Sequence, residues 1–458
     1  RYNNSQIPER DKIMINRKPI ITNSDAIYER AKPIIPAGSQ TFSKGVTQFV
    51  EGFAPKYLHK GKGAYVWDVD DNKYLDYIMG CHPIILGYAD PDVNQAVVNQ
   101  LELGSTFSQM NELEIDVAEL LIDAVPSAEM VRFGKNGADA TTIAVRIARG
   151  ITERDGIAFC GYHGWHDWFV ATTDLNKGIP KFNQDLAHSF GFNDLDSLEK
   201  IFKENPDQIS CVIMEPLTVL EPTNNFLEEV KKMAHHYGAL LIFDEVITGF
   251  RYSFGGAQEL TGVIPDLTCL AKAISNAIPL SAIVGKKEYM SCLDQTFFSF
   301  TYGGDCLGLA AAKACIPKMK QEKVSDHLWK VGAQLKDGFN DLAKAHNIAD
   351  YIECIGYPCR SVVTFDPKDT FDNLDMKSWF QQELLRRGVL WTAYHAICYS
   401  HKEEQIDYTL NCLDDIFPIF RDIVEKKKSL PSLIEGIPVR PVFRKVSDFN
   451  SYIQKDKL

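Results

Sequence analysis

The fold is decided by residues 238–251, which read GALLIFDEVITGFR. Five apolar residues follow Gly238 and lead into two carboxylates, Asp244 and Glu245. An apolar run without alternation is typical of a strand that is buried on both faces of a sheet. Ligands of open α/β sheets bind beyond the carboxyl ends of the strands, which is where Asp244 would lie. The alternative is that Asp244 only caps the turn that follows the strand.

Strands and helices are expected to alternate on both sides of this stretch. Between about residues 130 and 300, short apolar runs such as 130–133, 156–159 and 211–214 are separated by amphipathic stretches. This order predicts a mainly parallel sheet that is covered by helices on both faces. Residues 63–77 alternate around an Asp-Asp-Asn turn and predict a β-hairpin.

The chain has 458 residues, enough for one large domain and a smaller one. After about residue 315, long polar helices surround short strands, which predicts a lobe of the α+β type. We therefore expect four segments: an N-terminal segment with part of the small domain (1–75), a large domain (76–315), a C-terminal small domain (316–425) and a C-terminal extension (426–458).

Composition excludes several classes of partner. The net charge of −12 argues against nonspecific binding to nucleic acid. No stretch approaches the ~20 apolar residues of a membrane span, and the first residues lack the apolar core of a secretory signal. The eleven cysteines include no CxxC pair and predict free thiols. We expect a cytoplasmic protein that binds neither nucleic acid nor membranes.

Lys272 follows Asp244 by 28 residues and lies in the apolar context LAKA. Chemistry with pyridoxal 5′-phosphate (PLP) requires a lysine that holds the cofactor aldehyde and a carboxylate that keeps the pyridinium nitrogen protonated. An apolar setting favours the neutral, nucleophilic form of an amine. The pair therefore predicts a PLP site. The alternative for Lys272 alone is a surface lysine whose stem covers apolar neighbours.

Three further segments contain candidate ligand-binding residues. Residues 134–140 (GKNGADA) open a helix, and free backbone N–H groups there would suit a phosphate. Residues 161–168 (GYHGWHDW) offer aromatic rings for stacking, or form an aromatic core loop. Residues 299–305 (SFTYGGD) offer a hydroxyl beside two glycines, or a plain turn. His163 and His166 lack further ligands for a metal, so no metal is expected.

In chain order, these motifs resemble those of class III aminotransferases of fold type I, and most closely glutamate-1-semialdehyde 2,1-aminomutases. The matching motifs are Asn-Gly at 136–137, Tyr-His-Gly at 162–164, Glu-Pro at 215–216, Asp-Glu-Val at 244–246, Lys272 and Thr301. The likeness spans about residues 25–420. It implies an α/β fold of the fold type I PLP-dependent transferases. Such a fold has a large domain with a mainly parallel seven-stranded sheet between helices, and a smaller α+β domain from both chain ends.

The resemblance also implies roles around the cofactor ring. Lys272 would bind the cofactor covalently and move protons, and Asp244 would pair with the pyridinium nitrogen. Val246 would pack behind the ring. Tyr162 would stack on it, with His163 beside it.

Other roles concern the cofactor phosphate. Asn136, Gly137 and Ala138 resemble the residues that cradle it, and Glu215 belongs to the Glu-Pro motif on the cofactor side. Thr301 resembles a residue that reaches the phosphate of the neighbouring subunit. The resemblance therefore implies a homodimer with shared active sites.

The departures from the family concern mainly the substrate. The usual Ser-Gly-Thr-Glu turn is replaced by NGAD at 136–139, which removes two hydroxyls. Lys44 stands where the aminomutase has a carboxylate-binding Arg, and lysine cannot form the same bidentate contact. Within residues 391–401 the gating glutamate is absent, and His395 is the nearest candidate for a substrate contact.

We therefore predict transamination between an amino-acid donor and a small molecule that contains a carbonyl group, such as a sugar or surface-polysaccharide precursor. The link to polysaccharide pathways is an analogy. The alternatives are a glutamate-1-semialdehyde 2,1-aminomutase and a PLP-fold protein that binds a ligand without catalysis. Retention of Lys272 and Asp244 argues against the last alternative.

Overall fold

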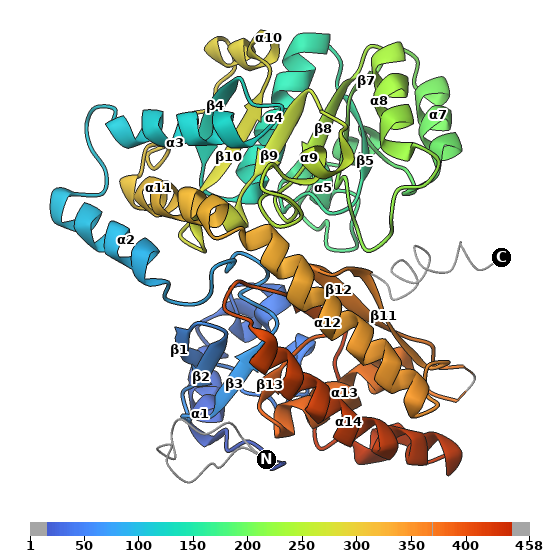
Figure 1. Ribbon diagram of the computed structural model, residues 1–458. Helices are drawn as coiled ribbons and strands as arrows, with labels where there is room; N and C mark the ends of the chain where they lie inside the picture. The colour runs from blue at the N-terminus through green and yellow to red at the C-terminus, as the bar shows by residue number, and fades with distance from the viewer. Residues whose placement is uncertain (1–15, 369, 442–458) are drawn as a thin grey trace. The chain divides into compact units, whose positions relative to one another are not determined.

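The computed structural model describes residues 16–368 and 370–441 (Figure 1). These residues form two compact units. The first unit comprises residues 16–81, 86–90 and 327–441, and the second comprises residues 82–85 and 91–326. Of the predicted C-terminal extension, residues 426–441 belong to the first unit. Residues 442–458 lie outside the described residues.

The second unit is built on a sheet of seven strands, as the resemblance implied. In sheet order the strands are β4 (Met130–Gly134), β10 (Ser281–Gly285), β9 (Leu267–Leu270), β8 (Leu240–Asp244), β7 (Ile209–Met214), β5 (Gly156–Cys160) and β6 (Ala187–Ser189). Strand β10 is antiparallel to both of its neighbours, and all other pairs are parallel. The prediction of a mainly parallel sheet is confirmed.

Helices cover both faces of this sheet because β8 is apolar on both sides (Figure 1). Leu240 and Ile242 pack in the cluster that contains helix α4 (Gly137–Thr152), whereas Leu241 and Phe243 pack in the cluster that contains α7 (Leu195–Glu204) and α8 (Phe226–His236). By this alternation Asp244 points toward the α4 face.

Helix α8 ends before β8 at Gly238, whose φ of +73° is typical of a glycine that ends a helix. The remaining helices of this unit are α2 (Pro91–Leu103), α3 (Glu112–Ala124), α5 (Asp167–Val170), α6 (Phe182–Asp185), α9 (Ala257–Thr261), α10 (Lys287–Met290) and α11 (Cys306–Gln321). Helix α11 packs against α2, α3 and the short η6 turn (Lys272–Ser275), so it supports the turn that carries Lys272.

The first unit contains two small sheets. The predicted hairpin is present as antiparallel strands β2 (Tyr65–Asp68) and β3 (Lys73–Asp76), flanked by β1 (Leu58–Lys62). Strand β13 (Val389–Leu390) pairs with β3 in parallel, so both ends of the chain contribute to one sheet. The second sheet contains β11 (Ile352–Tyr357), β12 (Arg360–Phe365) and β14 (Tyr394–Ala396).

Four long helices complete the first unit: α1 (Thr22–Ala31), α12 (Val324–Ala345), α13 (Asn373–Arg386) and α14 (Glu403–Glu425). An aromatic cluster joins α13 to α14, with Phe380 and Phe420 rings 4.9 Å apart. The tail turns through η8 (Leu430–Leu433) and pairs Ile437 with Glu51. Among the described residues, no helix is long and apolar enough to cross a membrane.

Candidate active site

Asp244 and Lys272 lie at the same edge of the seven-stranded sheet. Asp244 ends β8 and is opposite Cys269 of the parallel strand β9. Lys272 follows Cys269 by three residues and begins the η6 turn after β9, with a φ of +48°. This edge is formed by the carboxyl ends of β8 and β9, where ligands of α/β sheets bind. The placement of both residues is therefore consistent with the predicted PLP site.

The carboxylate of Asp244 is 5% exposed and has two hydrogen-bond donors. His163 Nδ1 lies 2.8 Å from Oδ2, and the backbone N–H of Val246 donates to Oδ1 at 3.1 Å. His163 Nε2 lies 3.2 Å from the carbonyl oxygen of Cys160. Since a carboxylate can only accept, Nδ1 is the donor of the bond to Asp244. His163 therefore orients a buried carboxylate.

His163 is itself held from both sides. Its ring stacks on Trp168 at a centroid distance of 6.1 Å, and its carbonyl accepts a hydrogen bond from the Thr141 hydroxyl at 2.8 Å. Tyr162, the neighbouring residue, is 43% exposed. The Tyr162 ring is therefore accessible to a ligand, while His163 is buried against Asp244.

The turn at the start of α4 offers backbone donors to an anion. Asp139 Oδ2 accepts the N–H groups of Lys135 and Asn136, both at 2.8 Å. The N–H groups of Gly137 and Ala138 have no hydrogen-bond partner in the part of the chain that the structure describes. Two donors at a helix N-terminus suit a phosphate. Backbone groups can thus replace the hydroxyls that this turn lacks.

The cradle and the segment after Asp244 are packed too closely for side chains at two glycines. A Cβ added to Gly137 would lie 2.9 Å from Val246 Cγ1. A Cβ added to Gly164 would lie 2.8 Å from Ala138 Cβ, and Gly164 also has a φ of +109°. The predicted cradle, the Tyr-His-Gly segment and Val246 therefore form one contiguous site.

Glu215 positions the Tyr162 loop. It follows β7, and its Oε1 accepts the backbone N–H of Tyr162 at 3.1 Å. The Glu215 N–H in turn donates to the carbonyl of Cys160 at 3.2 Å. Glu215 therefore fixes the backbone of the loop that carries Tyr162.

The sequence analysis missed Lys135 and Asp305. Lys135 Nζ lies 2.5 Å from Asp305 Oδ2 and 3.0 Å from the carbonyl of Pro279. This pair joins the phosphate turn to the loop that contains Thr301, across 170 residues of chain. Only the neighbouring glycines signalled these positions in the sequence. Thr301 itself is exposed.

Glu245 was also missed. It is 1% exposed and accepts hydrogen bonds from the Thr248 hydroxyl, from the N–H groups of Ala257 and Gln258, and from the Gln258 side chain. Burial raises the pKa of this carboxyl above its ordinary value. Glu245 therefore ties the segment after β8 to the start of α9.

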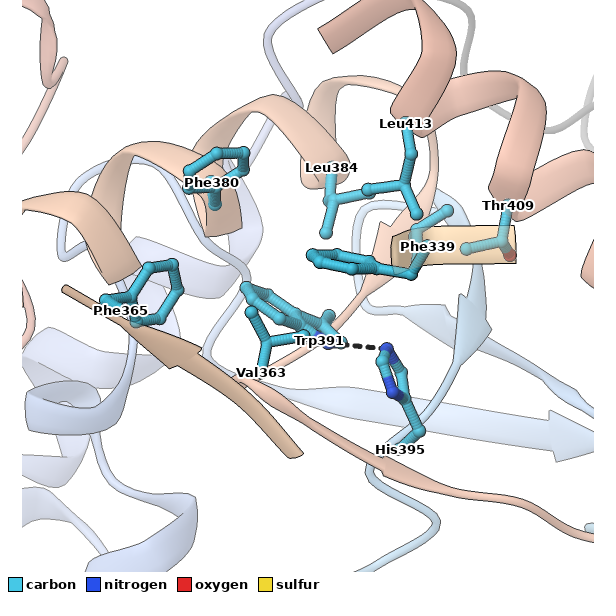
Figure 2. Close-up of a pocket in the computed structure, with 10 residues that line it drawn as sticks. Phe339, Val363, Phe365, Phe380, Leu384, Trp391, His395, Thr409 and Leu413 are labelled. Atoms are coloured by element: carbon cyan, nitrogen blue, oxygen red, sulfur yellow. Dashed lines mark hydrogen bonds between the residues drawn. The ribbon is translucent and has the colours of Figure 1, made fainter. Parts of the chain in front are cut away.

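The two predicted substrate residues belong to the first unit. Lys44 ends a short 3₁₀ turn (Phe42–Lys44) and is exposed. His395 is 2% exposed, and Trp391 Nε1 donates to its Nε2 at 3.1 Å (Figure 2). Its Nδ1 lies 2.9 Å from the Ser361 hydroxyl. The adjoining cavity of about 10 Å³ holds at most one water. The substrate role of His395 stays a prediction that this buried placement does not support.

Comparison with known proteins agrees with this geometry. The family "Aminotransferase class-III" matches residues 51–417. The chain belongs to the class III aminotransferases. It is 35% identical to a 3-aminobutyryl-CoA aminotransferase from Cloacimonas acidaminovorans over 420 residues, which is 90% of this chain and 99% of the relative. It is 36% identical to a glutamate-1-semialdehyde 2,1-aminomutase from Persephonella marina, over 80% of this chain and 92% of the relative.

A solved structure shares the fold and contains the cofactor. The PLP form of the FumI protein from Sphingopyxis has a TM-score of 0.83 at 25% identity, over 90% of this chain and all of the FumI chain. Class III aminotransferases depend on PLP, which supplies an electron sink for amino-group transfer when it is bound. Among the described residues, no cluster of His, Cys, Asp and Glu could hold a metal.

The residues of this chain fit PLP. The free N–H groups of Gly137 and Ala138 suit its phosphate, and the buried Asp244 suits a ring nitrogen that must keep its proton. The Lys272 amine would hold the cofactor and move a proton to or from the substrate carbon. Burial of Asp244 and His163 excludes water from the pair and strengthens their interaction.

Substitution of Gly164 by Ala tests the cradle. The added Cβ would push against Ala138 in a left-handed conformation, so we expect the dissociation constant for PLP to rise about tenfold or more. A titration of the apoenzyme with PLP, followed by absorbance, measures this change. Gly178→Ala is the control, because Gly178 has a φ of +92° and no atom within 4 Å of an added Cβ. Equal losses in both variants would contradict the proposed contact.

His395 predicts a pH dependence of stability. Burial lowers its pKa to about 3, so the unfolded chain binds one more proton than the folded chain between about pH 6.5 and pH 3. Stability is full above pH 6.5 and falls as the pH decreases, by about 1.4 kcal/mol per pH unit from this group. Urea unfolding at pH 7 and pH 5 measures how much the free energy of unfolding falls on acidification. This fall should be smaller for His395→Gln than for the wild type.

The matched control for that prediction is His59→Gln, at an exposed histidine of β1. Its fall in unfolding free energy between pH 7 and pH 5 should equal that of the wild type. An unchanged fall in His395→Gln would mean that the His395 ring is not held neutral in the folded state.

Proposed function

We propose that the acceptor of this aminotransferase is the carbonyl group of a sugar or surface-polysaccharide precursor, with an amino acid as donor. The observation that carries the proposal is the contrast between the cofactor-side residues and the predicted substrate residue. The cofactor-side residues Asp244, His163 and Lys272 come from segments at one sheet edge, whereas the carboxylate-binding Arg of the aminomutase is replaced by Lys44. A lysine supports a monodentate contact to a hydroxyl or carboxylate.

A second candidate acceptor is a coenzyme A thioester with a carbonyl group at carbon 3. It is favoured by the likeness to the 3-aminobutyryl-CoA aminotransferase over nearly the full length of both chains. The aminomutase reaction is a third candidate, supported by a similar identity over a smaller share of this chain. The absence of a gating glutamate in residues 391–401 weighs against it.

The same proposal assigns the roles of single residues. Lys272 and Asp244 are catalytic; Asn136, Gly137, Ala138, Tyr162, His163, Glu215 and Val246 hold the cofactor; Lys44 contacts the substrate. Thr301 serves the neighbouring subunit of a cytoplasmic homodimer, which its exposure allows. The wide exposure of Phe297, Tyr302 and Met110, at 79%, 60% and 87%, supports an interface in this region of the second unit.

A donor–acceptor screen tests the acceptor. The holoenzyme is mixed with a panel of amino acids, and the change of its visible absorbance identifies the donor. The aminated enzyme is then offered keto sugars, 3-oxoacyl-CoA thioesters and glutamate-1-semialdehyde. Return of the original spectrum with a keto sugar supports the proposal, and return only with the semialdehyde overturns it. Rescue of a tetrapyrrole-auxotrophic strain would likewise favour the aminomutase.

A further inference from the structure

An open groove of about 370 Å³ lies beside the cofactor site in the second unit. Its lining includes Arg146 and Arg149 of α4, the loop residues Trp165 and His166, Asp167 at the start of α5, and Asn183 of α6. We call it the Trp165 groove. Its volume falls within the range of about 300–1,000 Å³ that small-molecule sites occupy. None of these residues has a role in the cofactor site described above.

The groove adjoins the site through shared residues. Trp165 follows the Tyr-His-Gly segment directly. Trp168 stacks on His163, and its indole N–H donates to the Thr142 hydroxyl at 3.0 Å. That hydroxyl lies 2.6 Å from His166 Nδ1. A wall of Trp168 and Thr142 therefore separates the groove from the Asp244–His163 pair.

The two arginines leave most of their donors unused. Arg146 donates one hydrogen bond to the carbonyl of Phe297 at 2.8 Å, and Arg149 donates one to the carbonyl of Asp155 at 2.9 Å. Neither forms an ion pair with a carboxylate within residues 16–368 and 370–441. Two unpaired guanidinium groups one helical turn apart, in a chain of net charge −12, mark a site for an anion with several oxygens.

The other lining residues suit a base and a sugar. Trp165 is 67% exposed, and its ring meets His166 edge to face, so an indole face is available for stacking. The Asp167 carboxylate can accept hydrogen bonds from ribose hydroxyls, as acidic residues do in dinucleotide sites. The Asn183 amide has a donor and an acceptor for the edge of a base.

We propose that the Trp165 groove binds the nucleoside diphosphate part of the acceptor substrate. The inference rests on the proposed function and deepens it, because sugar precursors activated by a nucleotide and coenzyme A thioesters share a base, a ribose and a diphosphate. The carrier would be held in the groove, and the rest of the substrate would extend around the wall of Trp168 and Thr142 to bring its carbonyl group to Lys272. Contacts to the carrier would add binding energy for the substrate, although they lie away from the reacting carbon.

Calorimetric titration of the PLP-loaded protein with ADP, coenzyme A, UDP and inorganic pyrophosphate tests the proposal. ADP or UDP should bind saturably and at least about tenfold more tightly than pyrophosphate, since base stacking adds to the phosphate contacts. Tighter binding of coenzyme A than of UDP assigns the thioester class, and the reverse assigns nucleotide sugars. Absence of saturable nucleotide binding, or equal binding of pyrophosphate, overturns the proposal.

Three variants localise the binding. Arg146→Gln combined with Arg149→Gln should weaken ADP binding about tenfold or more, and Trp165→Leu should weaken ADP but not pyrophosphate. Arg132→Gln is the matched control, because Arg132 is an exposed arginine that donates to the carbonyl of Phe298 at 2.8 Å but does not line the groove. An equal loss in Arg132→Gln would place the binding elsewhere.

The outcome is separable from a failure of the proposed function. Retained PLP absorbance and circular dichroism show that each variant is folded. A protein that responds to amino donors without binding nucleotide overturns only the groove. The protein could instead bind nucleotide at the groove but transfer amino groups only to carbonyl compounds that carry no nucleotide. That result would overturn the assignment of the groove as a substrate site.

Discussion

Lys272→Ala should lose transaminase activity by about 10⁴-fold or more, since the covalent attachment and the proton transfer are lost together and proton transfer alone contributes ~10²–10⁴-fold. The backbone at Lys272 is left-handed, with a φ of +48°, in a turn that α11 supports. Lys272 thereby follows β9 at the sheet edge where β8 ends in Asp244. The variant should still bind PLP through the cradle, but reversibly.

Borohydride treatment followed by peptide mapping measures the linkage directly. In the wild type the reduced cofactor should be found on the peptide that contains Lys272, and in Lys272→Ala it should be found on none. Lys286→Ala is the control, because Lys286 follows β10 at the opposite edge of the sheet and pairs with Asp266. A label on any other lysine of the wild-type protein would remove the basis of the proposed mechanism.

Asp244→Asn should lower turnover by about 10²-fold or more while the protein stays folded. An amide has nearly the shape of the carboxylate and can still accept the Val246 N–H, but it carries no charge to hold a proton on a ring nitrogen. Nδ1 of His163 would then face an amide instead of a carboxylate. Single-turnover absorbance changes with saturating donor separate this effect from weaker cofactor binding.

The chain contains a matched pair for that experiment. Asp266 is also fully buried and lies 2.7 Å from a histidine, His235, but it precedes β9 at the far edge of the sheet. Asp266→Asn should also lower the stability, because it weakens the contacts of a buried carboxylate with the partly exposed His235 and with Lys286. Turnover per folded molecule should fall only in Asp244→Asn. A similar fall in both variants would show that the loss is structural.

Local pattern was sufficient for the elements. The apolar run before Asp244 is a strand buried on both faces, the Asp-Asp-Asn segment is the turn of a hairpin, and Gly238 ends a helix. Each of these depends on hydrophobic periodicity or on backbone conformation, which neighbouring residues in the chain determine. The resemblance to class III aminotransferases extended this to the sheet and to the cofactor.

Contacts between distant residues were not predictable in this way. Asp244 meets His163 across 81 residues, Lys135 meets Asp305 across 170, and Gln258 completes the shell of Glu245. His395, expected near the substrate, instead has both ring nitrogens engaged inside the first unit.

The sequence by itself determined which residue types stand at the ends of the strands. Only the tertiary structure decided which of them are buried together, because burial and hydrogen-bond partners depend on how strands and helices from different parts of the chain pack.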